Sequence, residues 1–276
     1  MNLIHSLEII PGKIVNAISP DKIIVLGYID KHRRRFSIFD NSFTEINYPE
    51  EINLLVIADC SNIDRSNVLD MLEQRCKALC RLTIIWLSPA AFNNQLEQNT
   101  PFAIRALQSG TILYQKWQPA DHIQTAINKK TETQVDKSEL FPWYERSQIF
   151  SQMAGVQFRF GNYGMAAFCI HQAVEQLLIM LFMNITGFRY GLHNLDRMLC
   201  ILRFHNDEAA NVFSKETSQG RDRLFILRKI YISYRYHSDV IISKDDIDYF
   251  FCELNKLQQM ADRVFYSKRY LGTEIY

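Results

Sequence analysis

The pattern of apolar positions along the chain changes near residue 119. Before that point, short apolar runs rich in β-branched residues alternate with stretches of helical periodicity, and turn residues bound each run. Such runs predict strands at Lys22–Ile29, Phe36–Phe39, Ile52–Ala58, Leu82–Leu87 and Thr111–Tyr114. Because strands that alternate with helices form layered domains, we predict an α/β domain over residues 1–118.

Two helices are predicted between these strands. Residues 62–80 place Val68, Leu72 and Cys76 on one side of a helix. Ser88 can accept hydrogen bonds from the first backbone N–H groups of the next helix, and Pro89 suits its first position.

From Pro119 onward the strand pattern stops. Residues 119–145 include the polar stretch Lys129–Ser138 and predict a linker. Residues 146–276 show helical periodicity in the segments Tyr163–Asn184, Asn194–Arg203, Arg221–Tyr236 and a last helix that starts at Ser243. Each apolar stripe must be buried against another, so an antiparallel all-α bundle is predicted. The whole chain is therefore predicted to be a two-domain α+β protein.

Composition narrows the function classes. Apolar residues make up 47% of the chain and charged residues 22%, as in soluble globular proteins. The net charge is +1 and both halves are close to neutral, which argues against indiscriminate nucleic-acid binding. No signal pattern is visible and the apolar run 177–183 is too short to span a bilayer, so we expect a cytoplasmic protein without a membrane partner. The six cysteines lack zinc-site spacing, so no metal or other cofactor is expected.

The first half resembles a known enzyme family. Lys22–Gly27 followed by Asn53–Ala58 is similar to the minimal nucleotidyltransferase fold related to polymerase β. The resemblance implies a Gly-Ser turn after one strand and two carboxylates at the start of the next, which bind Mg²⁺ during nucleotidyl transfer. Here Tyr28 follows the glycine and Asn53 stands where the carboxylates are expected. We therefore expect a degenerate domain, with an active transferase as the alternative.

The densest basic run of the chain, residues 31–35, falls between these two strands. A run of this kind favours a solvated hairpin tip. The alternative is a contact with phosphate or RNA.

The second half resembles the HEPN domain family over residues 141–266. The likeness is carried by residues 160–163, 166–167, 171–176, 187, 193–195 and 234–237. It implies that ribonucleases of this kind need an Arg and a His with four to six residues between them; the His moves a proton, the Arg steadies the phosphate charge, and metal is not required. His237 follows Arg235 by two positions and Arg228 by nine, so this spacing is not matched.

Candidate site residues gather at the end of the Arg221–Tyr236 segment. Residues 215–237 hold six Lys/Arg against two acids, interleaved with tyrosines. Basic groups beside aromatic rings suit a nucleotide or single-stranded RNA, although tyrosines at helical spacing equally fit a core. The predicted ligand-binding residues are Arg228, Arg235, Tyr236 and His237, and the candidates for catalysis are Arg228, Arg235 and His237.

His171 and Glu175 form another pair of interest, one helical turn apart. Their spacing favours a His–Glu hydrogen bond at the bundle surface or at a helix interface. A metal-binding or acid–base pair is the alternative.

Three functions fit these observations. The favoured one is a noncatalytic nucleotide- or RNA-binding HEPN-type module of a toxin–antitoxin, defence or stress system. The alternatives are a metal-independent HEPN ribonuclease and an antitoxin-like protein-interaction scaffold. The sequence thus leaves enzymatic activity undecided, with its absence favoured.

The HEPN resemblance also implies a homodimer formed through the helical domain. One junction gathers more aromatic side chains than a small core readily hides, namely Tyr231, Tyr234, Tyr236, Phe250 and Phe251. Pairing there would bring two copies of Arg228 and Arg235 into one electropositive cleft.

Overall fold

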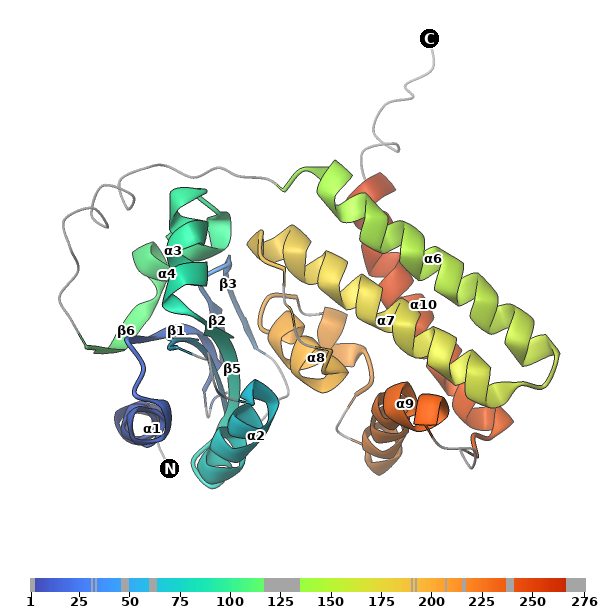
Figure 1. The fold of residues 1–276 in the computed structure, drawn as a ribbon, viewed down its shortest axis with the longest axis horizontal. Helices are drawn as coiled ribbons and strands as arrows, with labels where there is room; N and C mark the ends of the chain where they lie inside the picture. Colours follow the sequence, from blue (N-terminus) through green and yellow to red (C-terminus); the bar gives the residue numbers. More distant parts are fainter. Residues whose placement is uncertain are drawn as a thin grey trace, which may run out of the picture. The chain divides into compact units, whose positions relative to one another are not determined.

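The computed structural model of this chain describes residues 3–30, 32, 34–45, 50–59, 64–116, 135–189, 191, 193–206, 208–214, 217–236 and 241–266. The chain divides into two compact units, Met1–Thr133 and Gln134–Tyr276. The first unit is a mixed sheet with helices and the second is all-helical (Figure 1). This confirms the fold class that the sequence predicts.

The sheet of the first unit is mixed. Its strands are β1 Lys22–Ile29, β2 Arg34–Ser37, β3 Asp40–Glu45, β4 Glu51–Ile57, β5 Arg81–Leu87 and β6 Thr111–Gln115. They follow the order β3-β2-β1-β4-β5, and β6 pairs with β1 on the same side as β2. The pairs of β1 are antiparallel, whereas β4 and β5 are parallel. This register places Gly27 opposite both Ser37 and Asn53.

Helices cover both sides of this sheet. They are α1 Leu3–Ile18, α2 Arg65–Cys76, α3 Pro89–Glu97 and α4 Pro101–Ser109. In Figure 1, α1 and α2 lie on one side of the sheet and α3 and α4 on the other. The predicted cap of α3 is confirmed, because Ser88 Oγ accepts a hydrogen bond from Ala91 N at 3.2 Å.

The basic run between β1 and β4 is not simply a solvated tip. Within it, Lys31 and Arg33 lie outside the described residues. Arg34 pairs with Asp30 at 2.7 Å, and Asp30 also accepts backbone hydrogen bonds from His32 and Arg34. Arg35 is only 1% exposed, so this cation belongs to the interior and the prediction of a solvated run is wrong for it.

The second unit is built around one long helix. Its elements are α6 Lys137–Arg159, α7 Tyr163–Thr186, α8 Leu195–Arg203, a 3₁₀ turn η1 Glu208–Asn211, α9 Ser218–Tyr236 and α10 Lys244–Tyr266. Helix α7 contacts α6, α8, α9 and α10 (Figure 1). By length and composition α7 is the one helix among the described residues that could cross a membrane, but 83% of its most apolar window is buried inside the unit. That burial is typical of the central helix of a bundle.

The predicted linker is too long at its C-terminal end. Helix α6 already begins at Lys137, where Asp136 Oδ1 accepts a hydrogen bond from Ser138 N at 2.9 Å. Residues 137–145 thus belong to α6 and not to a linker. Leu140 and Tyr144 are buried in this stretch, and their burial stabilises the helix there. Residues 119–134 of the predicted linker lie outside the described part of the chain.

Two helix ends follow from local sequence. Gly187 ends α7 with a φ of 70°, a left-handed conformation that favours glycine. Ser243 and Asp246 form the predicted capping box of α10, since Asp246 N donates to Ser243 Oγ at 3.1 Å and Ser243 N donates to Asp246 Oδ2 at 3.3 Å.

Candidate functional site

A buried carboxylate on α7 is the centre of the candidate site. Glu175 has a side chain that is 4% exposed in a helix of mostly apolar residues. Its Oε1 lies 2.5 Å from Nδ1 of His193, which therefore donates a hydrogen bond to it. Its Oε2 has no hydrogen-bond partner among the described residues. The hydrogen bond from His193 is needed here, because desolvation of an unpaired buried carboxylate is costly.

His193 itself faces solvent. Its side chain is 66% exposed, and it lies in the connection between α7 and α8. The next residue, Asn194, caps α8 by accepting hydrogen bonds from Asp196 N and Arg197 N at 3.1 and 3.2 Å. The start of α8 thus fixes the backbone beside His193, and Glu175 fixes its ring. Its other ring nitrogen, Nε2, has no hydrogen-bond partner among the residues that the structure describes.

The predicted hydrogen bond between His171 and Glu175 is not formed. Nδ1 of His171 lies 3.9 Å from Glu175 Oε2, which is too long, and accepts from Gln172 Nε2 at 3.1 Å instead. Burial, followed by the charges of His193 and Arg235, lowers the pKa of His171 to about 3. His171 is thus a neutral ring in the core at physiological pH.

Helix α9 contributes an aromatic ring that stacks on His171 and His193, and a cation beside that ring. The ring of Tyr231 stacks on His171 and on His193, with centroids 5.2 and 6.2 Å apart. The Arg235 guanidinium lies 4.0 Å from the centroid of the Tyr231 ring, and its Nε donates to the Tyr231 carbonyl at 2.7 Å. We call His171, Glu175, His193, Tyr231 and Arg235 the α7–α9 cluster.

The predicted ligand residues are only partly brought together. Arg235 contacts the Tyr236 ring at 5.2 Å, and both residues are exposed at the end of α9. Arg228 lies two turns earlier on the same side of the helix, but its Nη1 is 3.7 Å from Asp196 Oδ2 on α8. His237 lies outside the described residues.

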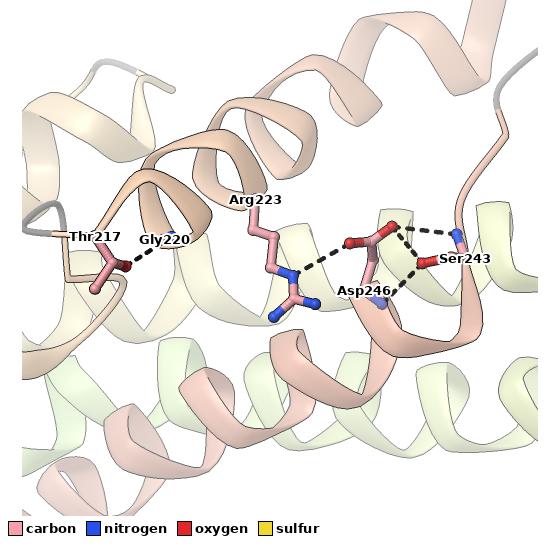
Figure 2. A network of polar contacts seen from close by, with 5 residues as sticks. All are labelled: Thr217, Gly220, Arg223, Ser243 and Asp246. Carbon is pink, nitrogen blue, oxygen red and sulfur yellow. Dashed lines mark hydrogen bonds and ion pairs between the residues drawn. The ribbon is translucent and has the colours of Figure 1, made fainter.

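Other members of the basic stretch have structural roles. Figure 2 shows Arg223 reaching from α9 to Asp246 at the start of α10, with Nε 3.3 Å from Oδ1. Its guanidinium also lies 4.6 Å from the Tyr249 ring. In the same view, Thr217 Oγ1 accepts from Gly220 N at 3.0 Å at the beginning of α9. Arg223 therefore links α9 to α10 through an ion pair with Asp246. Because this cation is already paired, the positive charge available to a ligand is smaller than the surplus counted over residues 215–237.

In the first unit, a buried amide lies where the nucleotidyltransferase resemblance leads us to expect carboxylates. Asn53 is fully buried beside Gly27 and Thr83, and neither its Oδ1 nor its Nδ2 has a hydrogen-bond partner among the described residues. The nearby carboxylate of Glu51 accepts from Thr83 Oγ1 at 3.0 Å and lies 3.7 Å from Arg81 Nε. Within the described ranges, no group of three or more His, Cys, Asp or Glu side chains could hold a metal ion.

Comparison with known proteins identifies the helical unit. The family model for the HEPN domain matches residues 142–261. These residues form a HEPN domain. The HEPN domain includes α7, the connection with His193, α9 and most of α10, and thus the whole α7–α9 cluster.

One solved structure is similar over the whole chain. It is described as a nucleotidyltransferase-like protein from Exiguobacterium sibiricum and is 13% identical, with 98% of this chain and 80% of that chain covered. The TM-score is 0.32, so the likeness carries no argument about function. No curated protein is significantly similar to the chain.

Sequence reasoning missed His193 as the partner of Glu175. The two residues are 18 positions apart and meet only because α7 ends at Gly187 and the chain turns back. The available signal was one acid inside a largely apolar helix, since a buried carboxylate requires a hydrogen-bonding partner.

Proposed function

We propose that the HEPN domain binds the phosphate of a nucleotide or of single-stranded RNA at the end of α9 and does not cleave it. The observation that carries this proposal is the position of Arg235. Its exposed guanidinium lies on the face of Tyr231, the ring that also stacks on the exposed His193. Two groups that can donate hydrogen bonds to a phosphate thus share one aromatic support.

The chemistry of the site suits a phosphate. A guanidinium offers a planar fork of donors, and hydrogen bonds to phosphate are charge-assisted and short. Tyr236 is 70% exposed next to Arg235, so its ring is available for stacking on a base. Because Arg228 is partly neutralised by Asp196, we assign it a secondary contribution.

A binding role in the cytoplasm is part of the proposal. Nucleotides and RNA are abundant there, and the cysteines at 76, 80, 169 and 252 are free thiols, as in a reducing compartment. A phosphate-binding HEPN domain behind a nucleotidyltransferase-like half suits a regulatory protein of a toxin–antitoxin, defence or stress system.

The test is binding of ATP, AMP and a short single-stranded RNA, measured by calorimetry and by fluorescence anisotropy. Replacing Arg235 with Ala removes a charge-assisted contact, so we expect an affinity about tenfold lower. Arg159→Ala, an equal charge change at the exposed end of α6, is the matched control and should bind like the wild type. Equal affinity of the wild type and Arg235→Ala would contradict the proposed site.

The second candidate function is metal-independent cleavage of RNA. One observation favours it: a buried carboxylate holds Nδ1 of an exposed imidazole, which orients that ring for proton transfer. Incubation of RNA with the protein in the presence of EDTA distinguishes the two functions. Cleavage that is lost in His193→Ala would establish catalysis, whereas intact RNA at saturating protein concentration supports binding alone.

A further inference from the structure

An indole ring on helix α6 carries two guanidinium groups. The guanidinium carbon of Arg146 lies over the Trp143 ring, 4.9 Å from its centroid, and that of Arg189 lies 4.7 Å from the same centroid. Both arginines are exposed, and the indole is half-buried. We call Trp143, Arg146 and Arg189 the Trp143 cluster. Because both distances end at one ring, the two cations are no more than about 10 Å apart.

The first two members of the cluster are held by the fold of α6. Trp143 and Arg146 are three positions apart in this helix, so their side chains lie on the same side of it. The neighbouring Tyr144 is buried, and its hydroxyl donates a hydrogen bond to Asp262 Oδ1 on α10 at 2.6 Å. That contact anchors the turn of α6 from which the indole projects.

Arg189 reaches the same ring from the connection between α7 and α8. Phe188, the residue before it, is buried, and its ring lies edge-on to that of Phe182 with centroids 6.1 Å apart. The backbone N–H of Phe188 donates to Thr186 Oγ1 at 3.0 Å. The backbone that carries Arg189 is therefore anchored. Two separate elements of the HEPN domain thus bring a cation to one indole.

The two cations of the cluster have no acidic partner. Within the described ranges, neither Arg146 nor Arg189 forms an ion pair or a side-chain hydrogen bond. The acids nearest in sequence are Glu139 and Glu145. Glu139 belongs to the first turn of α6, where the helix N-terminus favours a negative charge, and Glu145 lies about 200° around the helix from Trp143. Like charges held close together cost free energy, and an anion bound by both arginines would offset that cost.

The donors of the cluster suit a phosphate dianion. A guanidinium that stacks on a ring uses its face for the stacking, and its N–H groups, which lie in its plane, stay available to an acceptor. The indole N–H of Trp143 donates to no residue in the part of the chain that the structure describes, so it adds a third donor group. A phosphate group carries about −1.5 to −2 charges at pH 7 and has three strong acceptor oxygens, whereas a carboxylate has one charge and two oxygens. Two cations and three donor groups therefore match a phosphate better than a carboxylate.

The Trp143 cluster differs from the end of α9 in what its ring can do. At the end of α9, Tyr236 is 70% exposed beside Arg235, and its ring is available for stacking on a base. The half-buried Trp143 ring already supports two guanidinium groups, so the cluster provides no further ring for a base. Its donors therefore recognise a phosphate group without the rest of a nucleotide.

We propose that the Trp143 cluster is an anion site that binds a phosphate dianion through Arg146, Arg189 and the indole N–H of Trp143. The phosphate is either the free ion or the terminal phosphate of a small metabolite, and the cluster recognises the group that the two have in common. This site is independent of the proposed function, because it contains no residue of the α7–α9 cluster.

Tryptophan fluorescence of the full chain carrying Arg235→Ala tests the site, because this change weakens the site proposed at the end of α9. Addition of inorganic phosphate at constant ionic strength should change the emission until it saturates, and Trp143→Phe in the same background should abolish the change. AMP should act at the same concentrations as phosphate, since the base adds no contact, and acetate should have no effect. An equal response to acetate and phosphate, or none to phosphate, would refute the assignment.

Calorimetry with inorganic phosphate in the same background assigns the binding residues. Arg146→Gln and Arg189→Gln each remove one charged donor group, so each should weaken phosphate binding roughly tenfold. Arg159→Gln removes another exposed cation of α6 and is the matched control, which should bind phosphate like the parent protein. If Arg146→Gln and Arg189→Gln both keep the affinity of the parent, the proposal is overturned. Because the background already lacks Arg235, that outcome would leave the proposed function at the end of α9 unaffected.

Discussion

The neutral His171 ring makes the stability of the HEPN domain fall in acid. Burial and neighbouring positive charge lower the pKa of His171 from 6.5 to about 3. In the unfolded chain the ring takes up a proton below pH 6.5, whereas in the folded protein it does so only near pH 3. Between these values the unfolded state binds more protons, so stability decreases as the pH falls.

The size of the effect follows from the two pKa values. One pH unit in this window corresponds to about 1.4 kcal/mol for one proton, so His171 alone should remove about 2.5 kcal/mol between pH 7.5 and pH 4.5. His171→Gln lacks this titration. Its free energy of unfolding should be lower than that of the wild type at pH 7.5, and the difference should shrink by about 2.5 kcal/mol at pH 4.5.

Urea unfolding followed by far-ultraviolet circular dichroism at several pH values measures this difference. Cys169→Ala is the matched control: it truncates another buried side chain of α7, and burial raises the pKa of that thiol, so no charge changes in this window. It should lower stability by the same amount at every pH. If His171→Gln and Cys169→Ala show the same pH dependence, the assignment of a buried neutral His171 is wrong.

Two further predictions concern the helix ends and glycines of the HEPN domain. A Cβ on Gly220 would lie 2.0 Å from the Ser214 carbonyl oxygen, so Gly220→Ala should lower the free energy of unfolding by about 1–3 kcal/mol. A Cβ on Gly155 would meet no atom within 4 Å, so Gly155→Ala should raise the free energy of unfolding by about 0.5–1 kcal/mol. Thermal unfolding measures both, and a stabilising Gly220→Ala would contradict the close approach. Asp246→Ala removes the capping box and the bond to Arg223 and should cost about 1–2 kcal/mol, while Asp248→Ala, on the exposed side of the same turn, should cost less than about 0.5 kcal/mol. Equal losses in these two aspartate variants, measured by urea unfolding, would show that the network in Figure 2 does not stabilise the junction.

Local patterns predicted the elements well where burial is continuous. The strand Lys22–Ile29 was predicted with its observed bounds, because a run of β-branched residues buried on both faces has no competing interpretation. Strand β3 was missed, since Asp40–Glu45 has little apolar character and is a strand only because it pairs with β2. Tertiary pairing overrides local propensity at such positions.

The site was less predictable than the fold. Phe250 lies between Ile247 and Leu254 on one side of α10, a spacing that indicates a core position, yet it was assigned to an interface. The pairing of Glu175 with His193 depends on how α7 and the following turn pack, which no local pattern specifies. The sequence predicts Arg235 as a ligand-binding residue, but its contact with the Tyr231 ring, on which His193 also stacks, is visible only in three dimensions.

The salt dependence of RNA binding tests the phosphate site most directly. Each phosphate neutralised by a cation releases counterions, so the logarithm of the affinity falls linearly with the logarithm of the salt concentration. For a short single-stranded RNA, Arg235→Ala should reduce the magnitude of this slope by about 0.7, the value for one lost contact, while Arg159→Ala keeps the wild-type slope. Identical slopes and affinities for the wild type and Arg235→Ala would contradict the claim that this HEPN domain holds phosphate at the end of α9.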